Sequence, residues 1–281
     1  MTTEPQTIEI SGAQALIYRD APSWDGQRCA AIGNIEFIST VAGKDLLERI
    51  ATELKIEGFF GLVGPMNGDT WHSYRVVSES DGTPPFMMEP VSGPHDLSAF
   101  EAAGFLPMSH YVSTRADLAD TLGVRPVDLP EISVSAWDGL NAEELIRALF
   151  KMSGTAFASN KFFKPIDFNA FLQLYRPLLD MVDPRHVLFA HHAGGQLIGF
   201  LFGMPDRPVD GSKPAAILKT YASGMRGVGH LLADAYHRRA INMGFSEVIH
   251  ALMHEDNVSL MRSRQHKARI FRRYALMGRK L

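Results

Sequence analysis

The chain has 281 residues, a length typical of about two domains, and 46% of them are hydrophobic, enough apolar material for a real core. Its formal net charge of −3 argues against a general nucleic-acid binder. Cys29 is the single cysteine, which excludes an internal disulfide and a cysteine-based metal cluster.

Residues 1–11 contain no apolar core of a secretory signal, and the most apolar run, 197–204, is too short to span a bilayer. We therefore expect a cytoplasmic monomer or homodimer with no membrane and no nucleic-acid partner. The charge is uneven, because residues 251–281 carry eight Lys and Arg against Glu255 and Asp256. This basic segment either helps to hold an anionic ligand or, as we favour, forms a solvated helix and strand.

Residues 1–120 are predicted to contain short strands and two helices. The helix expected over 44–56 places Leu47, Ile50 and Leu54 on one face, and Gly58 follows as a stop signal. The other expected elements are strands at 13–18, 28–38, 59–63, 71–77 and 105–113 and a helix at 96–103. Gly43 is the only glycine between Phe37 and Leu46, so no glycine-rich turn precedes the first helix.

A domain boundary is predicted at 121–130, which carries two prolines and little hydrophobic pattern. It separates a domain over 1–120 from one over 131–281. In the second domain we expect helices begun by Asn141 and Asp167, a two-stranded hairpin over 187–202, and then strand, glycine-rich loop, helix, strand, short helix and strand. This order is mixed α/β without regular βαβ alternation.

The segment Ser223–Leu232 is the strongest functional motif. It follows an apolar strand pattern over 215–222, contains Gly224, Gly227 and Gly229, and opens a helical pattern. Glycines permit a tight turn, and the first N–H groups of a helix have no internal partner, so the combination favours an anion such as pyrophosphate. Arg226 adds a fixed positive charge. The alternative is an ordinary strand-to-helix turn.

Other side chains are interpreted structurally. His191 and His192 follow a strand, but no second ligand cluster stands at a useful spacing, so we predict hairpin-turn histidines and no metal site. The aromatic residues Trp71, Trp137 and Phe162-Phe163 are interpreted as core or cleft wall.

On these residues the chain resembles the GCN5-related N-acetyltransferase (GNAT) superfamily, whose signature is Arg/Gln-x-x-Gly-x-Gly/Ala between a strand and a helix. Gly227-Val228-Gly229 matches its second half, whereas Gly224 stands where Arg or Gln is usual. Gly61 to Asn67 and the segment 97–105 resemble parts of a second GNAT-like half. The resemblance implies two tandem GNAT-like lobes, each a mixed, mostly antiparallel sheet flanked by helices, with a degenerate N-terminal lobe.

The resemblance further implies an N-acyltransferase that uses acetyl-CoA or another acyl-CoA, without a metal, and acylates an amine of a small molecule or peptide by direct attack. The expected ligands of the acyl-CoA are Thr220, Tyr221, Ala222, Arg226, Gly227, Val228, Gly229, His230 and Asn257, with the backbone of Thr220 to Ala222 supplying the oxyanion donor.

The residues that would carry protons in the reaction match the superfamily pattern less closely than the loop does. Glu255 is the candidate general base, and Asn257 either contacts the coenzyme or simply caps a helix. Many superfamily members protonate the thiolate with a tyrosine, but residues 257–268 contain none. Ser259, Ser263 and His266 are the substitutes within this segment, and Tyr274 in the last strand is the tyrosine that we name as a candidate. Two alternatives stay open: a non-catalytic CoA-binding or sensor protein, and an aminoacyl-tRNA-dependent transferase, against which the acidic first 250 residues argue.

Overall fold

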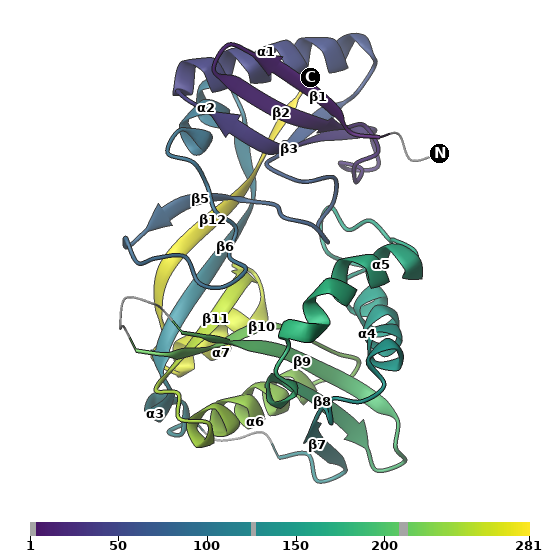
Figure 1. Ribbon diagram of the computed structural model, residues 1–281, viewed down its shortest axis with the longest axis vertical. Helices are drawn as coiled ribbons and strands as arrows, with labels where there is room; N and C mark the ends of the chain where they lie inside the picture. Colours follow the sequence, from purple (N-terminus) through teal and green to yellow (C-terminus); the bar gives the residue numbers. More distant parts are fainter. Residues whose placement is uncertain (1–3, 125–127, 208–212) are drawn as a thin grey trace. The chain divides into compact units, whose positions relative to one another are not determined.

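The computed structural model describes residues 4–124, 128–207 and 213–281. They divide into two compact units. Unit 1 comprises residues up to Tyr111, the short segment Asn160–Lys164 and the C-terminal Arg272–Leu281; unit 2 comprises Val112–Ser159 and Pro165–Phe271. Figure 1 shows the elements of both units, and each unit is described by itself below.

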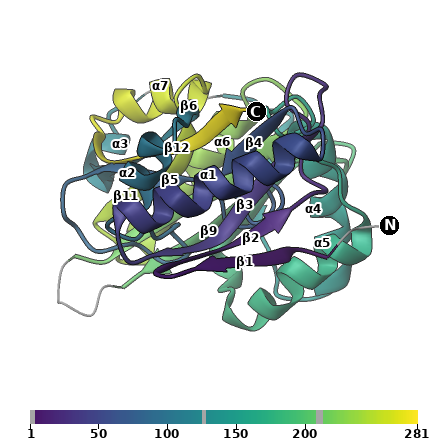
Figure 2. The same ribbon diagram turned by 90° about the horizontal axis from the view of Figure 1, so that it is seen from above.

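Unit 1 is built on strands in the order β1-β2-β3-β4-β12, with β5 paired to β12 as well. Helix α1 crosses the strands β1 to β3 (Figure 2) and buries Leu46, Leu47, Ile50 and Leu54 in the core of this unit. The elements are β1 (Gln6–Ile10), β2 (Ala13–Tyr18), β3 (Cys29–Phe37), α1 (Thr40–Ile56), β4 (Gly61–Gly64), β5 (Val76–Ser80), α2 (Asp96–Ala102), the first half of β6 (Leu106–Asp117) and most of β12 (Arg269–Lys280).

Unit 2 contains strands in the order β6-β11-β10-β9-β8-β7, and α6 packs along β8, β9 and β10. Its core joins Val228, Leu232 and Tyr236 of α6 to strand residues such as Leu201 and Ala216. The elements are the end of β6, α3 (Leu118–Thr121), β7 (Ile132–Ala136), α4 (Ala142–Ala156), α5 (Phe168–Tyr175), the 3-10 helices η1 (Arg176–Met181) and η2 (Pro184–His186), β8 (Val187–His192), β9 (Leu197–Asp206), β10 (Ala215–Ser223), α6 (Val228–Asn242), β11 (Glu247–His254) and α7 (Val258–Gln265).

Each unit contains one parallel strand pair joined by a helix. In unit 1 the crossover is β3–α1–β4, and in unit 2 it is β10–α6–β11. The other registered strand pairs in the described residues are antiparallel. The mixed, mostly antiparallel sheets and the repeated crossover confirm the predicted fold class and its tandem arrangement.

Several predicted details were wrong. Residues 6–10 form a strand that the sequence did not indicate, and α1 begins at Thr40, one turn earlier than predicted. Asn141 has a left-handed backbone (φ 51°) and its side chain makes no cap hydrogen bond, whereas Asp167 does cap α5 by accepting from the Ala170 amide at 2.8 Å. Local sequence patterns predicted where these helices lie, but the backbone conformation at each helix N-terminus determines whether the expected side chain caps it.

The compact units also differ from the continuous domains predicted over 1–120 and 131–281. The last strand of the chain lies in unit 1, where Met277–Lys280 pair antiparallel with Gly61–Gly64 of β4. Residues 112–117 of β6 lie in unit 2, where Arg115 forms an ion pair with Glu247 of β11 at 2.9 Å. Strand pairing therefore places the end of β6 in unit 2 and most of β12 in unit 1, although the sequence order predicts the reverse. Of the predicted linker 121–130, residues 125–127 lie outside the described residues.

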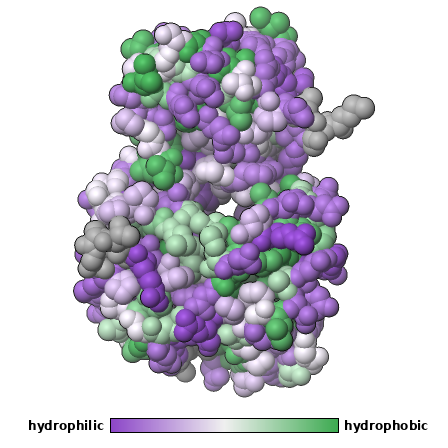
Figure 3. Space-filling view, viewed as in Figure 1, coloured by the Kyte–Doolittle hydropathy of each residue, from purple (hydrophilic) through white to green (hydrophobic). Residues whose placement is uncertain are grey.

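Within the described residues, no helix is both long and apolar enough to cross a membrane. The face shown in Figure 3 mixes hydrophilic and hydrophobic side chains on each unit.

Candidate functional site

Strands β10 and β11 separate in the middle of unit 2. Their parallel pairing extends from Ala215–Glu247 to Leu218–His250, although β10 continues to Ser223 and β11 to His254. Strand β10 meanwhile stays paired with β9, with an irregularity between Leu218 and Thr220. Beyond Leu218, one edge of β10 is therefore left without a registered partner strand among the described residues.

The backbone groups on this open edge follow from the pairing with β9. The Gly224 amide donates to the Ile198 carbonyl at 2.9 Å. Successive residues of an antiparallel strand present their backbone groups to opposite sides, so Ala222 and Thr220 also face β9. The N–H and C=O groups of Tyr221 and Ser223 then face the open edge. Within the predicted stretch Thr220–Ala222, Tyr221 is thus the residue with an outward-facing N–H group.

The predicted glycine-rich segment forms a tight turn between β10 and α6. The Met225 carbonyl accepts from the Val228 amide and from the Ser223 hydroxyl, both at 3.3 Å. Gly227 has φ 88°, a left-handed conformation that favours glycine, and it is the N-cap residue of α6.

The N-terminus of α6 differs from that of α1, its counterpart in unit 1. At α1 the Ser39 side chain accepts from the Ala42 amide at 3.1 Å, whereas Gly227 gives α6 no side-chain cap. The first N–H groups of a helix have no intrahelical partner. The Val228 amide donates to the Met225 carbonyl, so the amides of Gly229 and His230 are the ones that an anion at this helix N-terminus would meet. Of these two crossover helices, α1 has a side-chain cap at its N-terminus and α6 does not.

Two small residues let α6 lie close to the strands. A Cβ atom on Gly229 would stand 2.8 Å from Tyr221 Cε2, and one on Gly199 would stand 2.8 Å from Val228 Cγ1. Glycine at both positions therefore keeps the start of α6 against β9 and β10, beside the open strand edge.

The charged and polar side chains of the loop lie at the surface. Arg226 is exposed, and His230, one turn into α6, is half-buried. Burial, and to a smaller extent the nearby Arg262, lowers the pKa of His230 below its ordinary value, which disfavours a positive charge on its imidazole. The formal positive charge of the loop itself therefore comes from Arg226.

Glu255, Asp256 and Asn257 follow the end of β11. Glu255 is half-buried, whereas Asp256 is exposed and lies 3.8 Å from His254 Nδ1. The Asn257 side chain accepts from the Ser259 amide at 3.1 Å, so it caps α7. Of the two interpretations of Asn257, the structure supports the helix cap. Glu255 directly follows the end of β11, the strand that separates from β10.

Tyr274 lies in unit 1 and is fully buried. Its hydroxyl donates to Glu89, which also forms an ion pair with Arg272 at 2.7 Å. This tyrosine thus belongs to a buried polar network of unit 1 and exposes no surface from which to protonate a thiolate.

The histidines predicted to lie at a hairpin turn, and Trp71, make contacts within their own units. His191 and His192 end β8 at the turn into β9, and His192 Nε2 lies 3.2 Å from Glu131. Trp71 Nε1 donates to the Lys164 carbonyl at 2.8 Å within unit 1. Among the basic residues near the C-terminus, Arg262, Lys267, Arg272 and Arg273 form ion pairs with acids of the chain.

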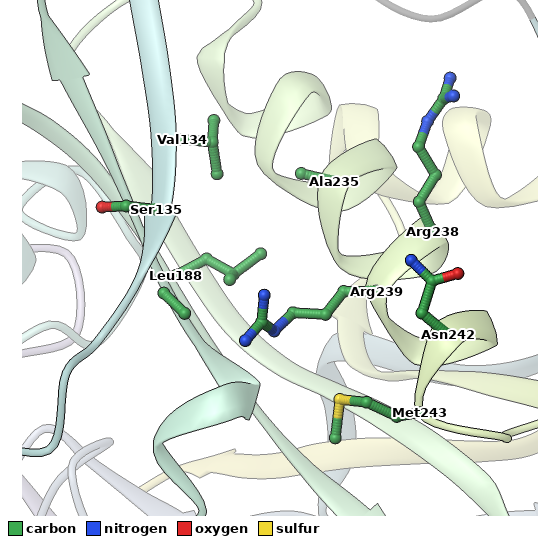
Figure 4. Close-up of a pocket in the computed structure, with 9 residues that line it drawn as sticks. Val134, Ser135, Leu188, Ala235, Arg238, Arg239, Asn242 and Met243 are labelled. Carbon is green, nitrogen blue, oxygen red and sulfur yellow. The ribbon is translucent and has the colours of Figure 1, made fainter.

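A pocket of about 480 Å³ lies at the other end of α6, between that helix and β7 and β8. In Figure 4, Arg239 extends across it while Arg238 points away. Arg239 Nε already donates to the Arg185 carbonyl at 2.7 Å. Because this pocket adjoins the C-terminal half of α6, it is separate from the glycine-rich loop.

The sequence patterns also missed a group of buried histidines in unit 2: His237, His250 and His266. They come from three different elements, so no local spacing connects all of them. The only local signal is Asp234 three residues before His237 on one helix face.

The fold has counterparts among solved structures. No family model matches the chain, and no curated protein matches its sequence. Among solved structures, a GCN5-related N-acetyltransferase from Sphaerobacter thermophilus aligns with a TM-score of 0.56 at 13% identity, covering 96% of this chain and 76% of that one.

Two other solved structures are similar. A tandem GNAT protein from the clavulanic acid biosynthesis pathway aligns with a TM-score of 0.55 at 14% identity, covering 95% of this chain and 78% of that one. A probable N-acyltransferase from Enterococcus faecalis V583 has a TM-score of 0.55 at 10% identity, with 96% of this chain and 59% of that one covered. At such identities the likeness shows the fold, which is that of the GNAT N-acetyltransferases.

Proposed function

We propose that the protein is an N-acyltransferase that transfers the acyl group of an acyl-CoA, acetyl-CoA being the first donor to test, to an amine of a small molecule or peptide. The observation that carries this proposal is the open edge of β10, which leads directly into a glycine-capped helix N-terminus. In an acyl-CoA, the amide-containing arm next to the thioester matches the open strand edge, and the pyrophosphate at the far end of that arm matches the helix N-terminus.

Each part of the donor has a partner in unit 2. The pyrophosphate lies at the first N–H groups of α6, around Gly229 and His230, with Arg226 as a mobile counter-charge. The amides of the pantetheine arm pair with Ser223 at the open strand edge, as an added strand would. The Tyr221 N–H group donates to the thioester carbonyl oxygen as negative charge develops there.

The reaction is a direct transfer. The amine nitrogen attacks the carbonyl carbon, the C–S bond breaks, an amide forms, and the CoA thiolate takes up a proton. Glu255 at the end of β11 accepts the proton that the amine loses, directly or through water. The thiolate requires a donor other than the buried Tyr274, and bulk water reaching the open edge supplies it.

Calorimetric titration of acetyl-CoA and a thiol-release assay over a broad panel of amines test this proposal. Cys29 is buried, and burial raises its thiol pKa to about 12, so the native protein contributes little background to a thiol reagent. We expect acetyl-CoA to bind and at least one amine class to release CoA above the rate of hydrolysis.

The two alternatives are outcomes of the same experiment. Tight CoA binding without thiol release for any amine would favour a sensor, in keeping with the engagement of Tyr274 by Glu89. Binding of aminoacyl-tRNA with no heat from acetyl-CoA would replace the proposal with the tRNA-dependent transferase.

A further inference from the structure

Three histidines from three elements meet in the interior of unit 2. His237 lies on α6, His250 on β11 and His266 at the end of α7, with exposed fractions of 2%, 5% and 1%. The His237 ring centroid lies 5.2 Å from that of His250 and 4.9 Å from that of His266. Asp234, almost one turn before His237 on the same helix face, adds a carboxylate.

A chain of hydrogen bonds leads away from His237. Its Nε2 atom lies 3.0 Å from His250 Nε2, and His250 Nδ1 lies 2.8 Å from the Ser263 hydroxyl, which is 2.7 Å from that of Thr114. When His237 donates from Nε2, His250 accepts there and donates from Nδ1 to Ser263, so each of these groups is satisfied. In this arrangement His237 Nδ1 carries a lone pair and no proton.

The remaining nitrogen atoms of the cluster have no partner among the described residues. They are His237 Nδ1 and both ring nitrogens of His266, all shielded from solvent. Buried polar atoms are normally hydrogen-bonded or metal-bound, so three unpartnered nitrogens in one place require an explanation. One ligand atom each from Asp234, His237 and His266 can be chosen so that all lie within 4.8 Å of one another.

The charged side chains at the cluster are Asp234 and Arg262, which form an ion pair. Arg262 Nη2 lies 3.0 Å from both carboxylate oxygens of Asp234. A carboxylate has about four lone-pair directions, and metal-binding carboxylates are usually hydrogen-bonded by an outer group, so Arg262 can orient Asp234 without occupying it fully. His237, His250 and His266 are all buried, and imidazole binds metals in its neutral form.

We propose that Asp234, His237 and His266 bind a divalent transition-metal ion of the zinc class, with His250 and Ser263 fixing the orientation of the His237 ring. Two imidazoles and a carboxylate suit Zn²⁺ and Co²⁺ and leave one coordination position for water. The ion would tie α6 to α7 on the side of the helix that faces β11.

The test uses untagged full-length protein, stripped with chelator and then titrated with Zn²⁺ or Co²⁺. We expect one equivalent of zinc by elemental analysis, a Co²⁺ visible absorption band of the strength of a four-coordinate site, and a rise in Tm on the order of 5 °C at zinc concentrations well above Kd. Absence of both the band and the Tm shift in the wild-type protein would overturn the proposal.

Three variants refine the result. His266→Gln and Asp234→Asn remove one ligand each while keeping a polar side chain, and we expect each to lower the affinity for Co²⁺ at least tenfold. His191→Gln, on β8, is the matched control and retains wild-type affinity. Circular dichroism in chelator shows whether each variant is folded. A folded His266→Gln protein that binds Co²⁺ as tightly as the wild type would show that the metal lies elsewhere.

Discussion

At the scale of single residues, the loop before α6 depends on one charged side chain and on two glycines. Arg226 is exposed and supplies positive charge, whereas Gly227 supplies a left-handed backbone and Gly229 a close approach to Tyr221. Gly224 differs from both, because no heavy atom lies within 4 Å of a Cβ added there and its φ is not positive. The three glycines of one motif therefore serve different purposes, and only substitution can separate them.

Charge substitutions at the loop should change acyl-CoA affinity in opposite directions. Arg226→Glu is expected to weaken acetyl-CoA binding about tenfold or more at low salt, because a carboxylate replaces the cation beside the pyrophosphate. Gly224→Arg restores a cation at the position where the superfamily signature has Arg or Gln, and should strengthen binding. Calorimetry at two salt concentrations measures both effects; equal affinities for all three proteins would mean that the pyrophosphate lies elsewhere.

His186 makes unit 2 sensitive to acid. The buried His186 Nδ1 lies 2.8 Å from the Tyr236 hydroxyl, which donates to the Ile217 carbonyl at 2.9 Å, so His186 is the donor to Tyr236. Burial lowers the pKa of His186 to about 4, an effect that Asp183 opposes. Because the folded pKa lies below the unfolded value of about 6.5, the stabilisation is complete above pH 6.5 and is lost as the pH falls toward 4.

The asparagine variant isolates this contribution. His186→Asn keeps an N–H donor for Tyr236 but does not titrate, so its stability relative to wild type should rise by about 3 kcal/mol between pH 7 and pH 4. Urea unfolding followed by tryptophan fluorescence and circular dichroism at both pH values measures the difference. Parallel pH dependence of the two proteins would mean that the pKa of His186 is the same in the folded and unfolded states.

At the scale of elements, the fit of α6 against β10 determines whether the open strand edge and the helix N-terminus form one site. Gly229→Ala would place a Cβ atom 2.8 Å from the Tyr221 ring, and Gly227→Ala would strain a backbone with φ 88°. We expect each to cost about 1–2 kcal/mol of stability and to weaken acetyl-CoA binding.

Gly224→Ala is the matched control for these two variants, since it adds the same methyl group in open space. Its Tm and its acetyl-CoA affinity should both stay at wild-type values. If Gly224→Ala were as damaging as Gly229→Ala, the loop rather than the helix–strand contact would determine the site.

The sequence predicted those features of the elements that depend only on neighbouring residues in the chain. The apolar period of α1, the Asp167 cap of α5 and the strand–turn–helix around Gly227 were all evident in the sequence. The separation of β10 from β11 was not, because it depends on which strand edges pair across the fold. The buried histidines were missed for the same reason, since strand and helix packing brings them together from separate elements.

At the scale of the whole molecule, short segments of the second half of the chain belong to unit 1. Segment Asn160–Lys164 belongs to unit 1, where Phe162 is buried and stacks edge-on against Trp24 at 6.3 Å between ring centroids. The C-terminal strand also belongs to unit 1, and its Ala275 and Met277 are part of that unit's core. A sequence-based boundary at 121–130 cannot reveal this exchange, because composition marks a linker but not the partner of a strand.

The exchange predicts how fragments of the protein behave. A fragment of residues 1–120 lacks β12, so β4 loses the strand that pairs with Gly61–Gly64, and Glu89 loses both Arg272 and Tyr274. An exposed edge strand and a buried carboxylate that has lost its ion pair are both destabilising, the second by about 3–5 kcal/mol. We therefore expect this fragment to aggregate or to show no cooperative unfolding transition by circular dichroism.

Joining residues 269–281 to the same fragment through a flexible glycine–serine linker returns β12 to unit 1 and should restore a cooperative transition. The matched control carries Arg272→Ala and Tyr274→Phe in the added strand, which keeps the strand pairing but removes the contacts of these two side chains with Glu89. It should unfold at a lower urea concentration than the intact fusion. Cooperative folding of residues 1–120 alone would instead show that the first half is an independent domain and that β12 only adds to a completed sheet.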